Sequence, residues 1–271
     1  MGYGWMIIPI LPIAMITMLG AAVFGILVSA ISSMGPITQP QDVQSVLTPI
    51  AGEIFAVYGS ALIGFFLVLM FGALAFYRLL DRRNRHFARQ QLLFSNFHRY
   101  LSLTGAGGSA EAVSRLGHIS EDSMQVEHQR PAGVWAVLFL FLSPVAGLVI
   151  PYDLTNDLRF HEALQARYQA ALVDAFRQAG YPTPLFPASK LHKRDPLLFI
   201  ILCAITAGLF WIYWFYTLLR DYNDHFADQA RFEDQVLGVL KPSAPKEVCK
   251  SCGGEIPENA RFCPSCGTQV S

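Results

Sequence analysis

Four long apolar runs alternate with polar segments along the chain. They cover residues 6–31, 54–77, 134–152 and 197–219. None of the four contains Asp, Glu, Lys or Arg. Each reaches or approaches the roughly 20 residues that a helix needs to cross a bilayer. We therefore expect an all-α integral membrane protein with about four hydrophobic helices.

Three of the runs pass into polar tails with helical periodicity, at residues 77–101, 152–178 and 216–240. In each tail a Tyr, a Leu, a His and a Gln recur at equivalent positions. These are Tyr77, Leu79, His86 and Gln90, then Tyr152, Leu154, His161 and Gln165, then Tyr216, Leu218, His225 and Gln229. Successive copies are 75 and 64 residues apart, so the sequence predicts an internal repeat of amphipathic helices within a helical membrane domain, residues 1–240.

The repeated Leu, His and Gln are separated by seven and four residues, so they share one face of each helix. One interpretation is that this face packs each tail against the others or against the membrane surface. The other is a histidine cluster that binds a metal ion or senses pH. Nothing else in the sequence brings the three histidines together, and both interpretations stay open.

Basic residues orient the first two runs. The connection between them, residues 32–52, contains no Lys or Arg, whereas five Arg fall within twelve residues after the second run. Because an excess of Lys and Arg marks the cytoplasmic side, the first two runs should form a hairpin with its tip outside. Localisation in the cell (inner or cytoplasmic) membrane, as a multi-pass protein, follows from this pattern.

The third and fourth runs are harder to orient. If each crosses once, residues 153–195 lie outside, yet this segment ends in the basic cluster KLHKRD at residues 190–195. Re-entrant hairpins would remove the conflict, with bends at Gly147, which follows Ser143 and Pro144, and at residues 206–208, if protein shields the irregular backbone. We expect four crossings, with two re-entrant hairpins as the alternative.

A short C-terminal segment carries specific chemistry. After a linker at residues 241–247, residues 248–271 contain two CxxCG motifs. The four sulfur ligands would be Cys249, Cys252, Cys263 and Cys266. Each CxxCG can wrap a knuckle whose Gly takes the left-handed conformation, and two knuckles make a tetrahedral four-sulfur site. One structural Zn²⁺ is the first choice, with Fe²⁺ as a possible mimic. Two disulfides are the alternative, and they would need an oxidising compartment.

Two resemblances follow from these residues. VCKSCGGEIPENARFCPSCGTQV resembles the short zinc-ribbon modules often appended to prokaryotic membrane proteins, and the match includes Ile256, Pro257, Ala260 and Phe262 between the cysteines. RDPLLFIILCAITAGLFWIYWFYTLLRDYN, from Arg194, resembles the DUF4234 membrane family, with its basic-Pro start, Thr-x-Gly turn and aromatic exit. The combination implies an archaeal or bacterial inner-membrane protein. The DUF4234 family brings no known activity.

Composition and charge exclude several functional classes. The chain is 53% hydrophobic and only 15% charged, which is too apolar for an ordinary soluble protein. Its formal net charge of zero makes nucleic acid an improbable partner. No nucleophile–base pair, phosphate-binding glycine loop or catalytic metal set is present, so we expect no enzyme and identify no small-molecule substrate.

The sequence thus favours a membrane-anchored adaptor or scaffold. Its zinc ribbon and cytoplasmic helices would dock protein partners at the lipid bilayer, with the ribbon in the cytoplasm. The alternative is a subunit of a membrane complex, channel or transporter in which the ribbon is a structural or regulatory cap.

Overall fold

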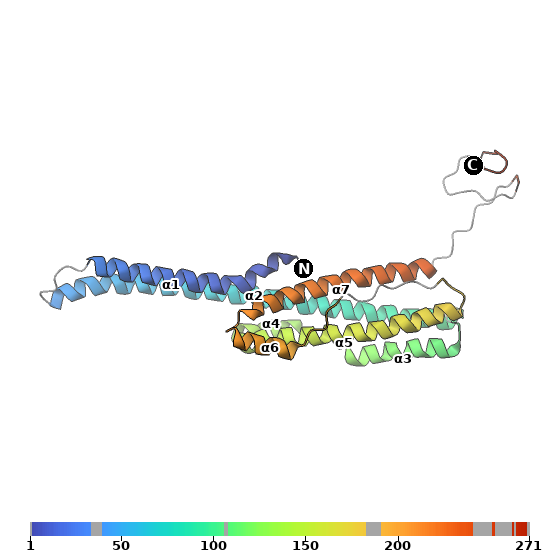
Figure 1. Cartoon of the computed structure of the whole chain (residues 1–271), viewed down its shortest axis with the longest axis horizontal. Helices are drawn as coiled ribbons and strands as arrows, with labels where there is room; N and C mark the ends of the chain where they lie inside the picture. Colours follow the sequence, from blue (N-terminus) through green and yellow to red (C-terminus); the bar gives the residue numbers. More distant parts are fainter. Residues whose placement is uncertain are drawn as a thin grey trace.

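The computed structural model describes residues 2–33, 40–105, 108–182 and 191–240, together with 251–252, 262 and 264–269. Up to residue 240 these ranges are almost entirely helical. A 3₁₀ turn, η1 (Tyr3–Met6), leads to α1 (Ile7–Ser33), α2 (Pro40–Thr104), α3 (Ala110–Val126), α4 (Ala132–Phe141), α5 (Ser143–Gln178), α6 (Pro196–Ile205) and α7 (Phe210–Leu240). Figure 1 shows that these helices form one elongated bundle.

α1 and the first part of α2 form an antiparallel hairpin that projects from one end of the bundle (Figure 1). Within the described ranges, these are the two helices long and apolar enough to cross a membrane. Their most apolar stretches are not buried by the rest of the chain, and Ile16, Phe24 and Phe55 are 69%, 69% and 84% exposed. Such a large uncovered apolar surface suits contact with lipid.

The third and fourth apolar runs do not form single helices. α4 and α5 are separated by Leu142 alone, where the run 134–152 folds back, and α6 and α7 are separated by residues 206–209, where the run 197–219 folds back. α4 and α6 have ten residues each, or about 15 Å of helix against a hydrocarbon core of about 30 Å. The expected four crossings are therefore not confirmed, and the fold-backs agree with the hairpin alternative.

The second fold-back satisfies its own polar backbone. Ala207 and Gly208 have φ angles of +49° and +90°, which reverse the chain between α6 and α7. The Thr206 hydroxyl donates to the Leu202 carbonyl (2.7 Å) and accepts from the Phe210 N–H (2.9 Å). A turn in apolar surroundings needs such internal partners, because lipid offers none.

Beyond the apolar end, three helices run side by side and form what we call the stalk: residues 77–104 of α2, 152–178 of α5 and 216–240 of α7 (Figure 1). Equivalent repeat positions lie together in its core. Leu79, Leu154 and Leu218 belong to one buried cluster. Tyr168 and Phe232, seven residues after their histidines, belong to another cluster, which Phe94 of α2 joins from one residue beyond the equivalent position. The three tails therefore point in the same direction and lie in equivalent register.

α3 covers one side of the stalk, where it packs against α2 and α5. It begins with a capping interaction in which the Ser109 hydroxyl accepts from the Ala112 N–H. Ala112, Leu116 and Ile119 are buried in the same cluster as the aromatic residues of the stalk. A helix of low overall hydrophobicity thus joins an existing core rather than building its own.

Substitution of Gly208 tests the geometry of the second fold-back. In the left-handed conformation of Gly208, an L side chain costs about 1–2 kcal/mol, although an added Cβ would meet nothing within 4 Å. We expect Gly208→Ala to lower the thermal unfolding midpoint of the detergent-solubilised protein. Gly59→Ala is the matched control, because its Cβ also meets nothing but its backbone is helical. Equal midpoints for the two variants would contradict the turn geometry.

Candidate metal centres

Two of the four predicted zinc ligands lie in the described part of the C-terminal segment. Cys252 and Cys266 are both exposed. Cys249 and Cys263 lie outside the described residues, as does the linker 241–247. The structure therefore describes most of the second CxxCG motif, residues 264–267, and this part can be compared with a zinc ribbon.

The second motif has the backbone of a metal-binding knuckle. Gly267, directly after Cys266, has a φ of +73°, which is the left-handed conformation predicted for the glycine of CxxCG. Phe262 and Gln269, which lie before and after the motif in sequence, form an antiparallel bridge. The Cys266 sulfur lies 3.2 Å from the Thr268 hydroxyl oxygen. This turn presents its sulfur at the surface, away from the helical core.

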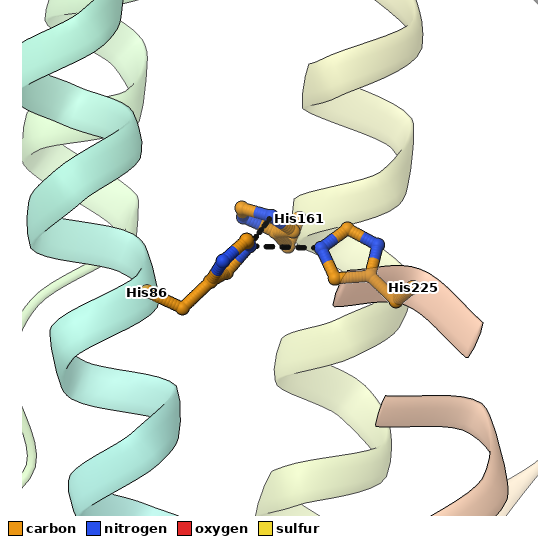
Figure 2. A group of neighbouring side chains, drawn as sticks. All are labelled: His86, His161 and His225. Atoms are coloured by element: carbon orange, nitrogen blue, oxygen red, sulfur yellow. Dashed lines mark hydrogen bonds between the residues drawn. The ribbon is translucent and has the colours of Figure 1, made fainter. Parts of the chain in front are cut away.

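A second group of ligand-type side chains lies inside the stalk. His86 of α2, His161 of α5 and His225 of α7 converge on one point (Figure 2). The Nε2 atom of His86 is 3.1 Å from Nε2 of His161 and 2.9 Å from Nε2 of His225. The three side chains are 7%, 0% and 1% exposed, respectively. The structure therefore brings together the three repeated histidines.

The repeat explains why these histidines meet. Each follows its buried leucine, Leu79, Leu154 or Leu218, by seven residues, which is about two helical turns along the same face. Because the three stalk helices leave the same end of the bundle in the same direction, equal spacing from the leucines places the imidazoles at equal depth. A stripe on each helix thus becomes one cluster.

Carboxylates bind the outer ring nitrogens of two of the histidines. Nδ1 of His161 lies 2.6 Å from an oxygen of Glu127, and Nδ1 of His225 pairs with Glu162. Such partners select the ring tautomer and orient the other nitrogen, as they do around many metal-bound histidines. Where the carboxylate is ionised and the ring is neutral, Nδ1 carries the proton and Nε2 presents a lone pair to the centre.

The imidazole rings are also held by aromatic packing. Phe87 stacks on His161, with ring centroids 4.3 Å apart and an interplanar angle of 11°. The ring of Phe226 lies 4.5 Å from that of His86. Arg83 lies over the Phe87 ring, 4.1 Å from its centroid. The histidines are therefore constrained in orientation as well as in position.

Glu127 reaches His161 because the segment after α3 is tied to the stalk. Arg130 donates two hydrogen bonds to Asp157, of 2.8 and 2.9 Å. Asn84 donates to the Arg130 carbonyl and accepts from its N–H. The Ser123 hydroxyl donates to the second oxygen of Glu127 at 2.6 Å. This network fixes a carboxylate inside the stalk from a segment that belongs to none of the repeats.

Burial sets the protonation states of the cluster. Loss of hydration lowers the pKa of His86 and that of His161 far below the ordinary value of a histidine. The same effect raises the pKa of Glu127 to about 7. The rings of His86 and His161 are consequently neutral, and a neutral imidazole nitrogen is the form that binds a metal ion.

A layer of buried amides lies one helical turn beyond the imidazoles. Gln90, Gln165 and Gln229 are 1%, 6% and 0% exposed, and each follows its histidine by four residues. Gln165 donates to Gln229 at 2.5 Å. Among the described residues, both amide atoms of Gln90 and the amide oxygen of Gln165 have no hydrogen-bond partner. Buried polar atoms of this kind call for a bound partner, commonly water or an ion.

The sequence identified only part of this arrangement. It placed the Leu, His and Gln of each tail on one helix face but could not choose between packing and a cluster. Glu162 is adjacent in sequence to His161, but its pairing with His225 of another repeat was not predicted. Glu127 carried no sequence signal, because it lies outside the repeats.

Comparison with known proteins bears on the C-terminal segment. Residues 248–270 match the family model of a zinc-ribbon domain, in agreement with the predicted C-terminal ribbon and its zinc. No curated protein and no solved structure matches the chain.

The ribbon ligands lead to a prediction about metal content. Cys252→Ser and Cys266→Ser should each lower the zinc bound per chain by one equivalent, because three ligands hold the ion less tightly than four. Cys203→Ser is the control, since Cys203 is 6% exposed within the apolar core. Elemental analysis of the desalted, full-length protein measures the difference. Zinc content unchanged in all three variants would contradict the assignment.

Proposed function

We propose that this chain is a membrane-anchored adaptor or scaffold, in which the α1–α2 hairpin holds the protein in the cell membrane and the zinc ribbon docks protein partners. The observation that carries the proposal is where the ribbon is attached. α7 ends at Leu240, at the opposite end of the bundle from the hairpin (Figure 1). Residues 216–240 extend about 37 Å at 1.5 Å per residue. A rigid stalk of this length would present the ribbon to partners well away from the bilayer surface.

The distribution of basic residues supports a cytoplasmic stalk and ribbon. Arginines crowd the start of the stalk in α2, at positions 78, 82, 83, 85 and 89. With the fourth run folded back, Lys193 and Arg194, just before α6, lie at this same end of the stalk. The conflict that four crossings created with the positive-inside rule then disappears. A reducing cytoplasm would also keep the ribbon cysteines available to zinc.

The proposed topology is therefore two crossings and two hairpins that enter the membrane from the cytoplasmic side. The crossings are α1 and the apolar part of α2. The hairpins are formed by α4 with the start of α5 and by α6 with the start of α7. The second hairpin carries the resemblance to the DUF4234 family, and membership of that family belongs to this proposal.

We propose no catalytic role. The second candidate is a subunit of a larger membrane complex, such as a channel or transporter, with the ribbon as a cap. The uncovered apolar faces of α1 and α2 favour it, since helices of another subunit could pack there. The four apolar runs contain no Asp, Glu, Lys or Arg. Because ion pathways usually carry ionisable residues within the membrane, this argues against ion transport by this chain alone.

Site-specific labelling tests the topology. We expect a cysteine at Gln44 to react with a membrane-impermeant maleimide in intact cells, and cysteines at Ser114 and Lys193 to react only after permeabilisation. All three side chains are exposed, so that access depends on the membrane rather than on the fold. Labelling at Lys193 in intact cells, with Ser114 protected, would instead establish four crossings.

Affinity capture tests the adaptor role. Cross-linked membranes that contain the full-length protein should yield a reproducible set of cytoplasmic proteins. The double variant Cys249→Ser, Cys252→Ser should lose this set while it remains in the membrane fraction, because the ribbon cannot fold without its metal.

Cys203→Ser, which removes a core cysteine, controls for changes in thiol number. Unchanged capture by the double variant would exclude docking through the ribbon. Loss of capture together with loss of other membrane subunits would favour the complex-subunit candidate.

A further inference from the structure

Three imidazole Nε2 atoms meet at the centre of the stalk, within hydrogen-bonding distance of one another through His86. When the rings are neutral and the carboxylates ionised, the pairing of His161 with Glu127 and of His225 with Glu162 places the proton on Nδ1 and leaves a lone pair on each Nε2. Both of these nitrogens face Nε2 of His86 (Figure 2). In that state the single Nε2–H of His86 can donate to one neighbour, and the lone pair of the other is left without a donor. Packing alone does not explain such a contact.

We propose that His86, His161 and His225 bind a single divalent transition-metal ion through their three Nε2 atoms. A cation at the centre accepts all three lone pairs and removes the conflict. Zn²⁺ is the first choice, and ions of the same class, such as Fe²⁺, Co²⁺ or Ni²⁺, also suit imidazole ligands. This site is separate from the four-sulfur site of the ribbon and does not depend on the adaptor proposal.

The spacing of the nitrogens fits such an ion. The three ligand atoms lie within 4.8 Å of one another, and the two closest pairs are 3.1 and 2.9 Å apart. With zinc–nitrogen bonds of about 2.0–2.1 Å, the nitrogens of a tetrahedral site are about 3.4 Å apart. The two pairs with His86 are therefore within a few tenths of an ångström of the bound spacing, and all three nitrogens are close enough to share one ion after small movements of the rings.

The surrounding charges also favour a divalent cation. Glu127 and Glu162 contact the outer side of two of the rings and offset a charge of +2 when both are ionised. The other charged groups that face the rings are of both signs: Arg82, Arg83 and Arg89 of α2, and Asp157 of α5. Arg83 is paired with Asp157 and Arg89 with Glu233, so the carboxylates of Glu127 and Glu162 are left to offset part of the charge of a buried divalent ion.

The buried glutamines next to the imidazoles could hold the fourth ligand of the ion. Three protein ligands leave one position of a tetrahedral ion for a small molecule such as water. The partnerless amide atoms of Gln90 and Gln165 belong to the layer next to the imidazoles, so they can bind such a molecule. The buried leucines before the imidazoles and the buried aromatic residues after the glutamines separate these polar groups from bulk solvent along the stalk.

The test uses the full-length protein with all four ribbon cysteines changed to serine, which removes the thiolate site. We expect one equivalent of Co²⁺ or Zn²⁺ per chain, visible Co²⁺ absorption typical of nitrogen ligands, and a higher thermal unfolding midpoint with the metal. The rise is expected because one ion would join α2, α5 and α7, and a ligand of the folded state stabilises it.

Three single variants in this background locate the site. Glu162→Gln should weaken Co²⁺ binding about 10–100-fold, as loss of an outer partner does, and His86→Gln should weaken it further. His118→Gln, at a side chain that is 75% exposed on α3, should bind Co²⁺ as the parent does.

Two results would overturn the proposal: no uptake of Co²⁺ or Zn²⁺ by the folded parent, or the same affinity in the His86→Gln and His118→Gln variants. Because a misfolded His86→Gln chain would also lose metal, Glu162→Gln provides the second test. If it unfolds at a lower temperature than the parent but keeps full Co²⁺ affinity, the cluster serves packing only.

Discussion

Burial of a polar belt between three parallel helices is the constraint on which the stalk depends. The three imidazoles and three amides of this belt are at most 7% exposed. Buried polar groups cost free energy unless they find partners. Any slip of one helix against the others would separate these groups from one another and from Glu127 and Glu162. The belt therefore selects one register, while the leucine and aromatic layers on either side supply apolar burial.

The same constraint accounts for the short helices at the apolar end. Three copies of one tail can face one another at equal depth only if all three leave the same end of the bundle. α2 arrives there after a long apolar helix, but α5 and α7 must start there. The fold-backs at Leu142 and at residues 206–209 make this possible. α4 and α6 bring the chain to the apolar end of the bundle, and α5 and α7 run from there into the stalk. Thr206 and Gly208 make the second reversal compatible with an apolar environment.

The two candidate metal centres differ in chemistry and in place. The ribbon offers thiolates at the surface of a segment too short to bury a core, where metal binding and folding are coupled. The stalk offers neutral imidazoles inside a bundle that already has an apolar core. In the proposed arrangement, metal at the first centre shapes a docking surface, and metal at the second ties together the three helices that support it.

The sequence by itself determined the features that are local. Runs of uncharged residues, the repeated Leu-His-Gln stripe and the CxxCG motifs depend only on composition and on spacing along one helix or turn. The helical class, the long apolar hairpin and the C-terminal zinc ribbon were therefore predictable. Only the tertiary structure decided that the third and fourth runs each divide into two helices, because a continuous helix and a folded-back pair use the same apolar residues. It also decided that the three stripes meet, and that Glu127, 34 residues from His161, completes the cluster. Such contacts depend on the direction in which each helix leaves its turn, which no periodicity within one helix encodes.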